Sequence, residues 1–268
     1  MTFGLNTGIM ERMGALEEAM MSLKLFQTGR TNMNKTKEKM KQLNKGFTLV
    51  EMLVVIAIIA ILASILIPVV ARAKTKAKIA TAKIQMAEID GAIKSYKNDY
   101  ERYPMPKGIS ANKWGDVTFT SDIGALYDNA KMVEILTNPN HARNPKKNKY
   151  LDVKESSEPA SSRRPGLSSE GRYLDPLGNE YVISMDKNRD GFCADNYYGK
   201  IGAVRVDGTG TLHSGIGIGL EERGFGAAGT AFVLKGEVMI WSAGPDRLVN
   251  PAAGALDKEN ADNIIHWK

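Results

Sequence analysis

A short acidic segment has the spacing of a calcium-binding loop. Asp186, Asn188 and Asp190 stand at alternate positions, and Gly191 follows them. In such a loop, alternate oxygen side chains converge on one hard cation, and glycine at the sixth position permits the sharp turn. The twelfth position, where a bidentate glutamate completes the full pattern, is Tyr197. The segment therefore predicts either a calcium loop or an Asp/Asn/Gly turn between strands.

The residue types needed for catalysis do not gather in the sequence. His141, His213 and His266 are far apart, and each has a polar or strand-edge context. Cys193 is the only cysteine and has no histidine nearby, which makes it a poor candidate nucleophile. A single cysteine also excludes an intramolecular disulfide and a cysteine-rich zinc site. We therefore expect the chain not to be an enzyme.

An uncharged apolar segment dominates the N-terminal third of the chain. Residues 52–71 carry no formal charge, and a helix of that length is about 30 Å long, the thickness of a bilayer core. A buried core helix would be shorter and would have a polar stripe, and the apolar part of a signal peptide is usually about 7–15 residues. Lysine and arginine flank the run on both sides, so charge alone does not set its orientation. We predict a membrane-spanning helix.

One carboxylate stands at the edge of this apolar run. Glu51 precedes residues 52–71 directly, and an isolated carboxylate there is costly in lipid, so it requires a partner. Cleavage between Gly46 and Phe47 would create an amine that could neutralise Glu51 on a neighbouring copy. This arrangement suggests that the apolar helices assemble with one another.

The segment KGFTLVE at 45–51, followed by a long apolar helix, resembles the leader and cleavage motif of type IV prepilins and type II secretion pseudopilins. The resemblance implies that a prepilin peptidase cuts after Gly46 on the cytoplasmic side and methylates the amine of Phe47. Glu51 then becomes the fifth residue of the mature chain, where the family has glutamate. Pro68 becomes the twenty-second, where many members have a helix-perturbing proline. The apolar run would be retained as a single-pass anchor in the inner membrane.

The leader of residues 1–46 is longer than the short basic leaders of that family. Starting at Met33 or Met40 would give a more typical length, so we interpret residues 1–32 as an early assigned start. The alternative is a genuine amphipathic extension. Residues 1–46 hold eight basic and four acidic side chains, or +4 of the formal charge of +6, which leaves +2 for residues 47–268. A mature chain so close to neutral is not expected to bind nucleic acid.

Beyond the apolar run, the helix is expected to continue to about residue 103, interrupted at Pro68 and ended by Pro104 and Pro106. Its apolar residues recur at spacings of three and four: Ile79, Ala82, Met86, Ile89, Ile93, Tyr96, Tyr100 and Tyr103. The flanks of this stripe lack the sustained complementary charge of a coiled coil. We therefore predict that it packs on the chain's own head, residues 104–268.

The head is predicted to be α+β. A short amphipathic helix is expected at 121–137, and strands at 181–185, 201–206 and 232–241. Polar and glycine-rich stretches predict extended loops at 138–172 and 208–230. The whole chain is thus expected to have a type IV pilin-like fold, in which a long N-terminal helix packs on a small antiparallel sheet.

Three segments of the C-terminal half extend the resemblance. DPLGNEY at 175–181, SAGPD at 242–246 and ADNI at 261–264 resemble the C-terminal half of the major pseudopilin of type II secretion. In that family these segments close a loop around calcium. Carried over, the resemblance implies ligands from five residues: Asp246, Asp262, Asn260, Asp257 and the main-chain carbonyl of Ala243. A bound cation would stabilise the folded loop by mass action, in place of the disulfide that usually closes the loop of type IV pilins.

Together these features favour a structural subunit of a type II secretion pseudopilus. Its expected partners are copies of itself, other pseudopilins, prepilin peptidase, the inner-membrane assembly platform and the membrane. The head is expected in the periplasm or another extracytoplasmic space. Two alternatives stay open: a subunit of a type IV or DNA-uptake pilus, and a membrane-anchored calcium-dependent enzyme.

Overall fold

The computed structural model describes residues 47–121, 125, 127–200, 219–250 and 259–267, together with residues 14, 17, 18, 20–22 and 24. The chain divides into two compact units, Met1–Ile67 and Pro68–Lys268. The predicted strand at 201–206 lies outside the described residues. The same holds for Gly46 and for Asp257.

One long helix, α2, runs from Leu49 to Tyr100 over 52 residues. Its length confirms the predicted helix, whereas the predicted interruption at Pro68 is wrong, because Pro68 lies inside the continuous helix. A proline removes one backbone donor and crowds the carbonyl four residues earlier, and the helical hydrogen bonds on either side carry α2 through that position. The apolar side chains of its first part are exposed, as at Ile56 (64%) and Leu62 (61%). In the part of the chain that the structure describes, α2 is the one helix long and apolar enough to cross a membrane.

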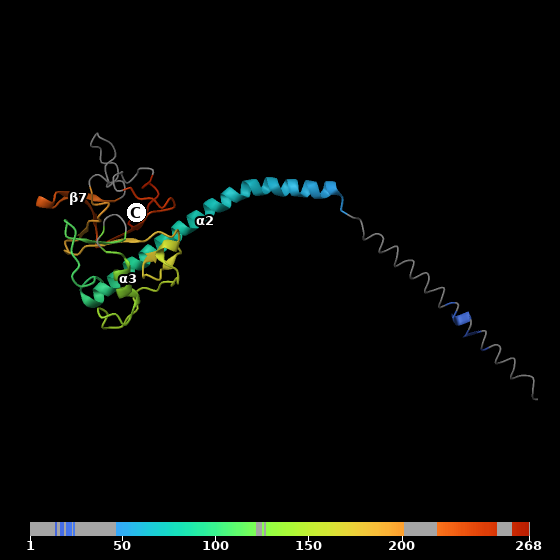
Figure 1. The fold of residues 1–268 in the computed structure, drawn as a ribbon, viewed down its shortest axis with the longest axis horizontal. Helices are drawn as coiled ribbons and strands as arrows, with labels where there is room; N and C mark the ends of the chain where they lie inside the picture. The colour runs from blue at the N-terminus through green and yellow to red at the C-terminus, as the bar shows by residue number, and fades with distance from the viewer. Residues whose placement is uncertain are drawn as a thin grey trace, which may run out of the picture. The chain divides into compact units, whose positions relative to one another are not determined.

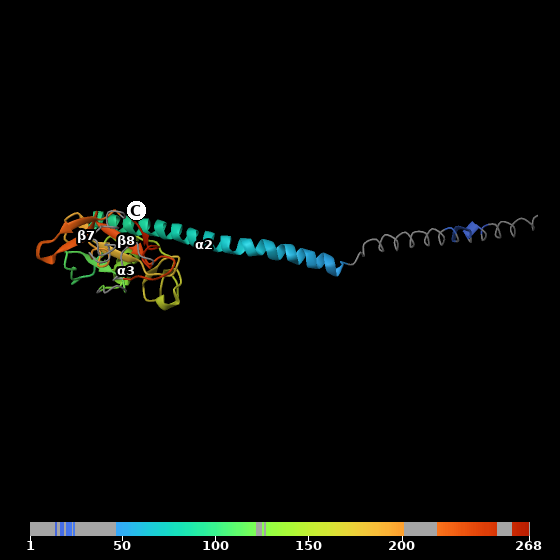
Figure 2. The ribbon, with the colours of Figure 1, turned by 90° about the horizontal axis from the view of Figure 1, so that it is seen from above.

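The second half of α2 carries the core of the head. Met86, Ile89, Ile93 and Tyr96 are fully buried, and Ile79 packs against them from the edge. These positions follow the stripe predicted from the sequence, so the prediction that it packs on the chain's own head is confirmed. Figures 1 and 2 both show the strands and α3 gathered around this half of α2.

Among its described residues, the head has three small antiparallel sheets. Its largest has the order β1-β4-β8-β9, formed by Val117–Phe119, Val182–Met185, Val238–Ser242 and Ile264–Ile265. The second has the order β5-β7-β6, formed by Phe192–Cys193, Thr230–Lys235 and Glu221–Gly224. The third pairs β2 (Gly166–Leu167) with β3 (Tyr173–Leu174). Helix α3 (Ala130–Thr137) and two 3₁₀ turns, η1 (Ala160–Ser162) and η2 (Gly226–Ala228), complete the elements.

The four-stranded sheet is buried on both faces. In β8, Val238 and Ile240 belong to the core that includes α2, whereas Met239 and Trp241 belong to a second cluster. This division follows from the alternation of side chains along a strand. The α+β fold with a long N-terminal helix is therefore confirmed.

Three predicted boundaries in the head need correction. The helix expected from residue 121 begins at Ala130, because Tyr127 pairs with Phe119 in a bridge. The strand expected at 232–241 is two strands, and β7 and β8 belong to different sheets. Residues 221–224, in the stretch expected to be a loop, form β6.

Candidate functional site

The predicted processing motif begins helix α2 with a reciprocal cap. The backbone N–H and the hydroxyl of Thr48 both donate to Glu51 Oε2, each at 2.8 Å. In return, the N–H of Glu51 donates to Thr48 Oγ1 at 3.2 Å. Such a capping box satisfies backbone donors that have no partner inside the helix. Glu51 therefore orders the start of α2 in the uncleaved chain, and Phe47 just before it is 77% exposed.

In the head, two of the segments that carry the family resemblance, 175–181 and 242–246, lie against each other. Asp175 Oδ1 accepts the N–H groups of Leu177 and Asn179, each at 2.8 Å, and thereby holds the turn before β4. Asn179 Nδ2 donates to the carbonyl of Gly244 at 2.8 Å. The hydroxyl of Ser242 donates to Asp175 Oδ2 at 2.8 Å. Burial raises the pKa of Asp175, and these hydrogen bonds oppose the rise.

The loop after β8 then closes on the C-terminal segment. The N–H of Asp246 donates to Asp262 Oδ2 at 2.9 Å. Gly244 has a φ of +68°, and a Cβ on it would lie 2.2 Å from the carbonyl oxygen of Asp262. Only glycine fits such a close approach in the left-handed region. Asp246 and Asp262 are thus brought together, as the resemblance implied.

This corner offers oxygens to a cation. Asp262 Oδ1 is buried and has no hydrogen-bond partner, and an unsatisfied buried carboxylate oxygen is costly. Burial, followed by the charge of Asp246, raises the pKa of Asp262. A hard cation between the two carboxylates would supply the missing partner and relieve their repulsion. Two carboxylates, one of them with an unpartnered oxygen, are therefore the groups that this corner could offer to calcium.

The other predicted ligands of this site are less well placed. Asn260 Oδ1 accepts the N–H of Asn250 at 3.0 Å, and Asn260 Nδ2 donates to the carbonyl of Asn250 at 3.1 Å. Both polar atoms of the Asn260 side chain are therefore hydrogen-bonded to the backbone of Asn250. Ala243 lies in the same loop and is half-buried. Within the described residues, no three His, Cys, Asp or Glu side chains gather as a metal-binding group.

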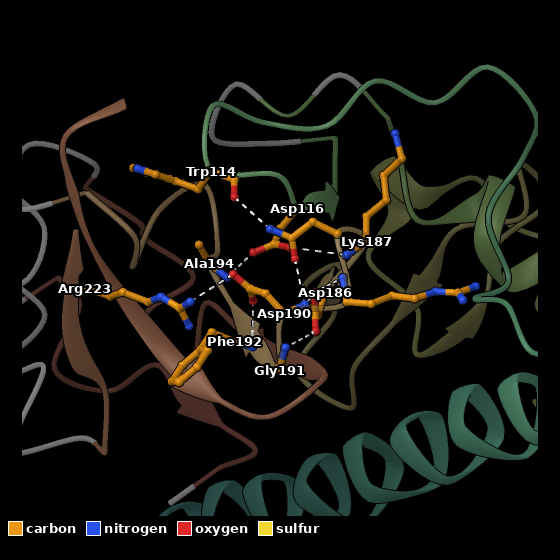
Figure 3. A network of polar contacts seen from close by, with 11 residues as sticks. Trp114, Asp116, Asp186, Lys187, Asp190, Gly191, Phe192, Ala194 and Arg223 are labelled. Atoms are coloured by element: carbon orange, nitrogen blue, oxygen red, sulfur yellow. Dashed lines mark hydrogen bonds and ion pairs between the residues drawn. The ribbon is translucent and has the colours of Figure 1, made fainter. Parts of the chain in front are cut away.

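The second predicted calcium loop, at 186–191, is held by protein groups (Figure 3). Asp186 Oδ1 accepts the N–H of Arg189 at 2.7 Å, and its Oδ2 accepts that of Gly191 at 2.8 Å. Asn188 Oδ1 accepts the N–H of Asp190 at 3.1 Å. These are the bonds of an Asx-type turn, so the turn between strands β4 and β5 is the arrangement that the structure describes.

A protein cation approaches this turn. Arg223, on β6, places its guanidinium 3.4 Å from Asp190 Oδ2 and 3.8 Å from the centre of the Phe192 ring. A guanidinium beside the carboxylate already supplies the positive charge that calcium would bring. We therefore confine the calcium proposal to the C-terminal loop.

Asp116 is hydrogen-bonded to the segment that contains the 186–191 turn, and the sequence did not point to it. It is fully buried, and its carboxylate accepts the N–H groups of Lys187 (3.2 Å) and Ala194 (2.7 Å). Burial and the nearby charges of Asp186 and Asp190 raise the pKa of Asp116 to about 7. Its position before β1 carries no sequence signal, because an aspartate ahead of a strand is common in exposed turns.

Cys193 and Asp195 also lie inside the head. Cys193 is a free, fully buried thiol, and burial raises its pKa well above the usual range. Such a thiol is inert as a nucleophile. Asp195 accepts bonds from the N–H groups of Tyr197 and Tyr198 and from the hydroxyl of Ser184, which is a structural role.

Comparison with known proteins bears on the N-terminal part of the chain. Residues 41–67 match the prokaryotic N-terminal methylation motif. This match confirms the resemblance drawn from KGFTLVE and the apolar helix that follows it.

Two curated relatives are proteins of type II secretion. The chain is 40% identical to type II secretion system core protein G of Klebsiella pneumoniae over 63 residues, which is 24% of this chain and 45% of that protein. It is 41% identical to the same core protein of Aeromonas hydrophila over 64 residues, again 24% of this chain and 45% of that protein. The chain thus spans less than half the length of the curated relatives that it matches. No solved structure matches it significantly.

Proposed function

We propose that this chain is a structural subunit of a type II secretion pseudopilus. One observation carries the proposal: the methylation motif at 41–67 leads directly into a helix whose first half is exposed and apolar and whose second half anchors a folded head. Both relatives with about 40% identity are secretion proteins by name. A helix with an exposed apolar first half and a second half that packs in the head suits a subunit that assembles with others. The proposed role is therefore structural, not catalytic.

In this proposal, prepilin peptidase cleaves after Gly46 and methylates the amine of Phe47. The helix stays in the inner membrane until the subunit joins the filament, and the head lies on the extracytoplasmic side. In the filament, apolar N-terminal helices of successive copies and of other pseudopilins pack together. The carboxylate of Glu51 then pairs with the amine of a neighbouring copy, which removes two charges from an apolar interior. Pro68 falls within the packed part of the helix.

Calcium is proposed as the stabiliser of the head's C-terminal loop. Asp246 and Asp262 would hold it, with the carbonyl of Ala243 in the same loop; Asp257 is a further ligand by the family resemblance alone. A cation that binds the folded loop and not the unfolded chain increases stability in proportion to the logarithm of its concentration.

The direct test is the N-terminus of the mature protein. The full chain is produced in bacterial inner membranes with and without an active prepilin peptidase, and its N-terminus is read by mass spectrometry. We expect N-methylated Phe47 with the peptidase and an intact leader without it. Any other mature N-terminus would contradict the processing step.

A second test separates secretion from a pilus. The gene is placed in a strain whose type II system lacks its major pseudopilin, and export of that system's substrate is measured. Restored export supports the secretion role. If export fails while surface fibres containing the chain form, the chain is a pilus subunit.

A further inference from the structure

A polar cavity of about 610 Å³ lies in the head, away from the network around Asp116. Its walls come from separate stretches of the chain: the turn after η1, the hairpin end that leads into β3, the turn before β4 and the loop after β8. The first two stretches belong to the 138–172 segment, which lies outside the family resemblance. A cavity of this size can hold several side chains or a small ligand.

Three arginines line this cavity: Arg163, Arg172 and Arg247. Arg172 lies 3.7 Å from the carboxylate of Glu170, another lining residue, and its Nε is buried without a hydrogen-bond partner. The structure gives the side chains of Arg163 and Arg247 neither an ion pair nor a hydrogen bond with any residue that it describes. By contrast Arg164, the neighbour of Arg163, pairs with Glu158 at 3.9 Å and does not line the cavity.

Both unpaired arginines are exposed at the surface. Arg163 and Arg247 both have left-handed conformations, with φ of 53° and 64°. These are uncommon for residues with a side chain. The carbonyl of Arg163 packs directly over Gly178, where a Cβ would lie 2.3 Å from it. Two separate loops thus each present an exposed arginine at the cavity.

The charges of the cavity favour an anionic ligand. Among the described residues that line the cavity, three arginines against Glu170 and Glu180 leave a formal charge of +1. Glu180 is already satisfied, since its carboxylate accepts bonds from Ser121 and from the N–H of Asn129. Arginine forms paired hydrogen bonds with a carboxylate.

The rim also includes an apolar contact. Leu248 is 53% exposed and lines the cavity beside Arg247. A ligand that offers carboxylates together with aliphatic groups suits this mixture better than a free small anion, and an acidic stretch of polypeptide has both.

We propose that this cavity binds a carboxylate-bearing segment of another polypeptide, with Arg163 and Arg247 as the groups that recognise its carboxylates. The proposal does not depend on the pseudopilus role, because the cavity lies wholly in the head. Within that role, the segment would belong to a protein that meets the head during export.

The test uses the purified full-length chain in detergent micelles and two fluorescently labelled peptides. One has two adjacent glutamates flanked by leucines, and the other has glutamines in their place. We expect anisotropy to report saturable binding of the glutamate peptide, at least tenfold weaker binding of the glutamine peptide, and weakening by 0.5 M salt. Free glutamate, as a competitor, should displace the labelled peptide only at concentrations at least tenfold above those of unlabelled peptide.

Variants assign the binding to the two arginines. Arg163→Gln and Arg247→Gln should each weaken binding about tenfold, the loss expected when one charge-assisted pair is removed. Arg164→Gln is the matched control and should leave affinity unchanged. Equal binding of the two peptides, or unchanged affinity in both cavity variants, would overturn the proposal. Displacement by free glutamate as effective as by peptide would overturn its polypeptide part. If a cavity variant does not fold, the comparison of the two peptides and the salt dependence, both measured on the unmodified chain, still test the proposal.

Discussion

The hydroxyl of Ser242 donates a hydrogen bond to Asp175 Oδ2 at 2.8 Å across 67 residues of sequence. Asp175 holds the turn before β4, and Ser242 ends β8. Both residues are fully buried, so neither can take water as a substitute partner. The bond therefore joins the two segments that form the C-terminal corner of the head.

We expect Ser242→Ala to lower the free energy of unfolding by about 1–3 kcal/mol, the usual cost of leaving a buried polar group without its partner. Chemical denaturation of the full chain in detergent, followed by tryptophan fluorescence, measures the change. Ser169→Ala is the control, because Ser169 is exposed and should shift stability by less than about 0.5 kcal/mol. Equal effects of the two substitutions would show that the bond does not stabilise the corner.

Removal of calcium should destabilise the head. We expect chelation to lower the melting temperature by about 5 °C or more, since saturating ligand contributes about 2–3 kcal/mol. Asp262→Ala should abolish this response, because it removes the buried, unpartnered oxygen. Asp190→Asn should keep the response, since Arg223 already approaches Asp190. A response that disappears in Asp190→Asn and persists in Asp262→Ala would move the site to the 186–191 loop.

Asp116 should make stability depend on pH. Its pKa in the folded head is raised to about 7, whereas an aspartate in an unfolded chain has a pKa of about 3.9. Between these values the folded state binds the proton more tightly, so the contribution of Asp116 to stability is fully present below pH 4 and is lost as the pH rises to about 7. The size of the fall attributable to this group is about 2–4 kcal/mol.

The measurement compares the unmodified chain with the Asp116→Asn variant in a chelating buffer. The introduced amide does not titrate, but its single oxygen cannot replace both carboxylate oxygens toward Lys187 and Ala194, so the variant is less stable throughout. The stability advantage of the unmodified chain over the variant should shrink from pH 4 to pH 8. An advantage that stays constant, or grows, would contradict the raised pKa.

Which features the sequence could predict depends on how local their causes are. The stripe on α2 was predictable because apolar side chains at spacings of three and four fall on one face of a helix by geometry alone. The division of residues 232–241 into two strands was not predictable, because the alternation of side chains continues through Gly236. Only the pairing of β7 with β5 and of β8 with β4 separates the two strands. The alternation of side chains along a strand does not indicate which distant strand it will pair with.

The candidate site divides in the same way. The motif around Gly46 and Glu51 is a contiguous string, and the sequence sufficed to find it. The role of Asp116 depends on amides about 70 to 80 residues later, and that of Arg223 depends on the pairing of β6 with β7. Neither residue type is unusual at its position, so only the fold identifies them.

The stripe on α2 can be tested with two isoleucines of the same helix. Ile89 is fully buried, whereas Ile84 is 61% exposed. We expect Ile89→Ala to lower the free energy of unfolding by about 2–5 kcal/mol through the lost contacts and the cavity. Ile84→Ala should change it by less than about 0.5 kcal/mol. Similar losses at both positions would mean that this part of α2 packs against something besides its own head.

Glu51 has two separable tasks under the proposed function. In the uncleaved chain its carboxylate caps α2 through Thr48, and in a filament its charge would neutralise the amine of a neighbour. Glutamine can still accept the cap's hydrogen bonds but has no charge. Glu51→Gln should therefore keep the start of the helix and lose assembly, while Glu51→Ala should lose both.

Two readouts separate the tasks. Hydrogen exchange at residues 49–52 of the unprocessed chain reports the cap, and we expect faster exchange in Glu51→Ala and in Thr48→Ala than in Glu51→Gln. Filament yield in cells that express prepilin peptidase reports assembly, and it should fall in both Glu51 variants and be retained in Thr48→Ser, which keeps the capping hydroxyl. Normal filaments from Glu51→Gln would show that the charge is not needed, and the carboxylate's role would then be confined to the helix cap.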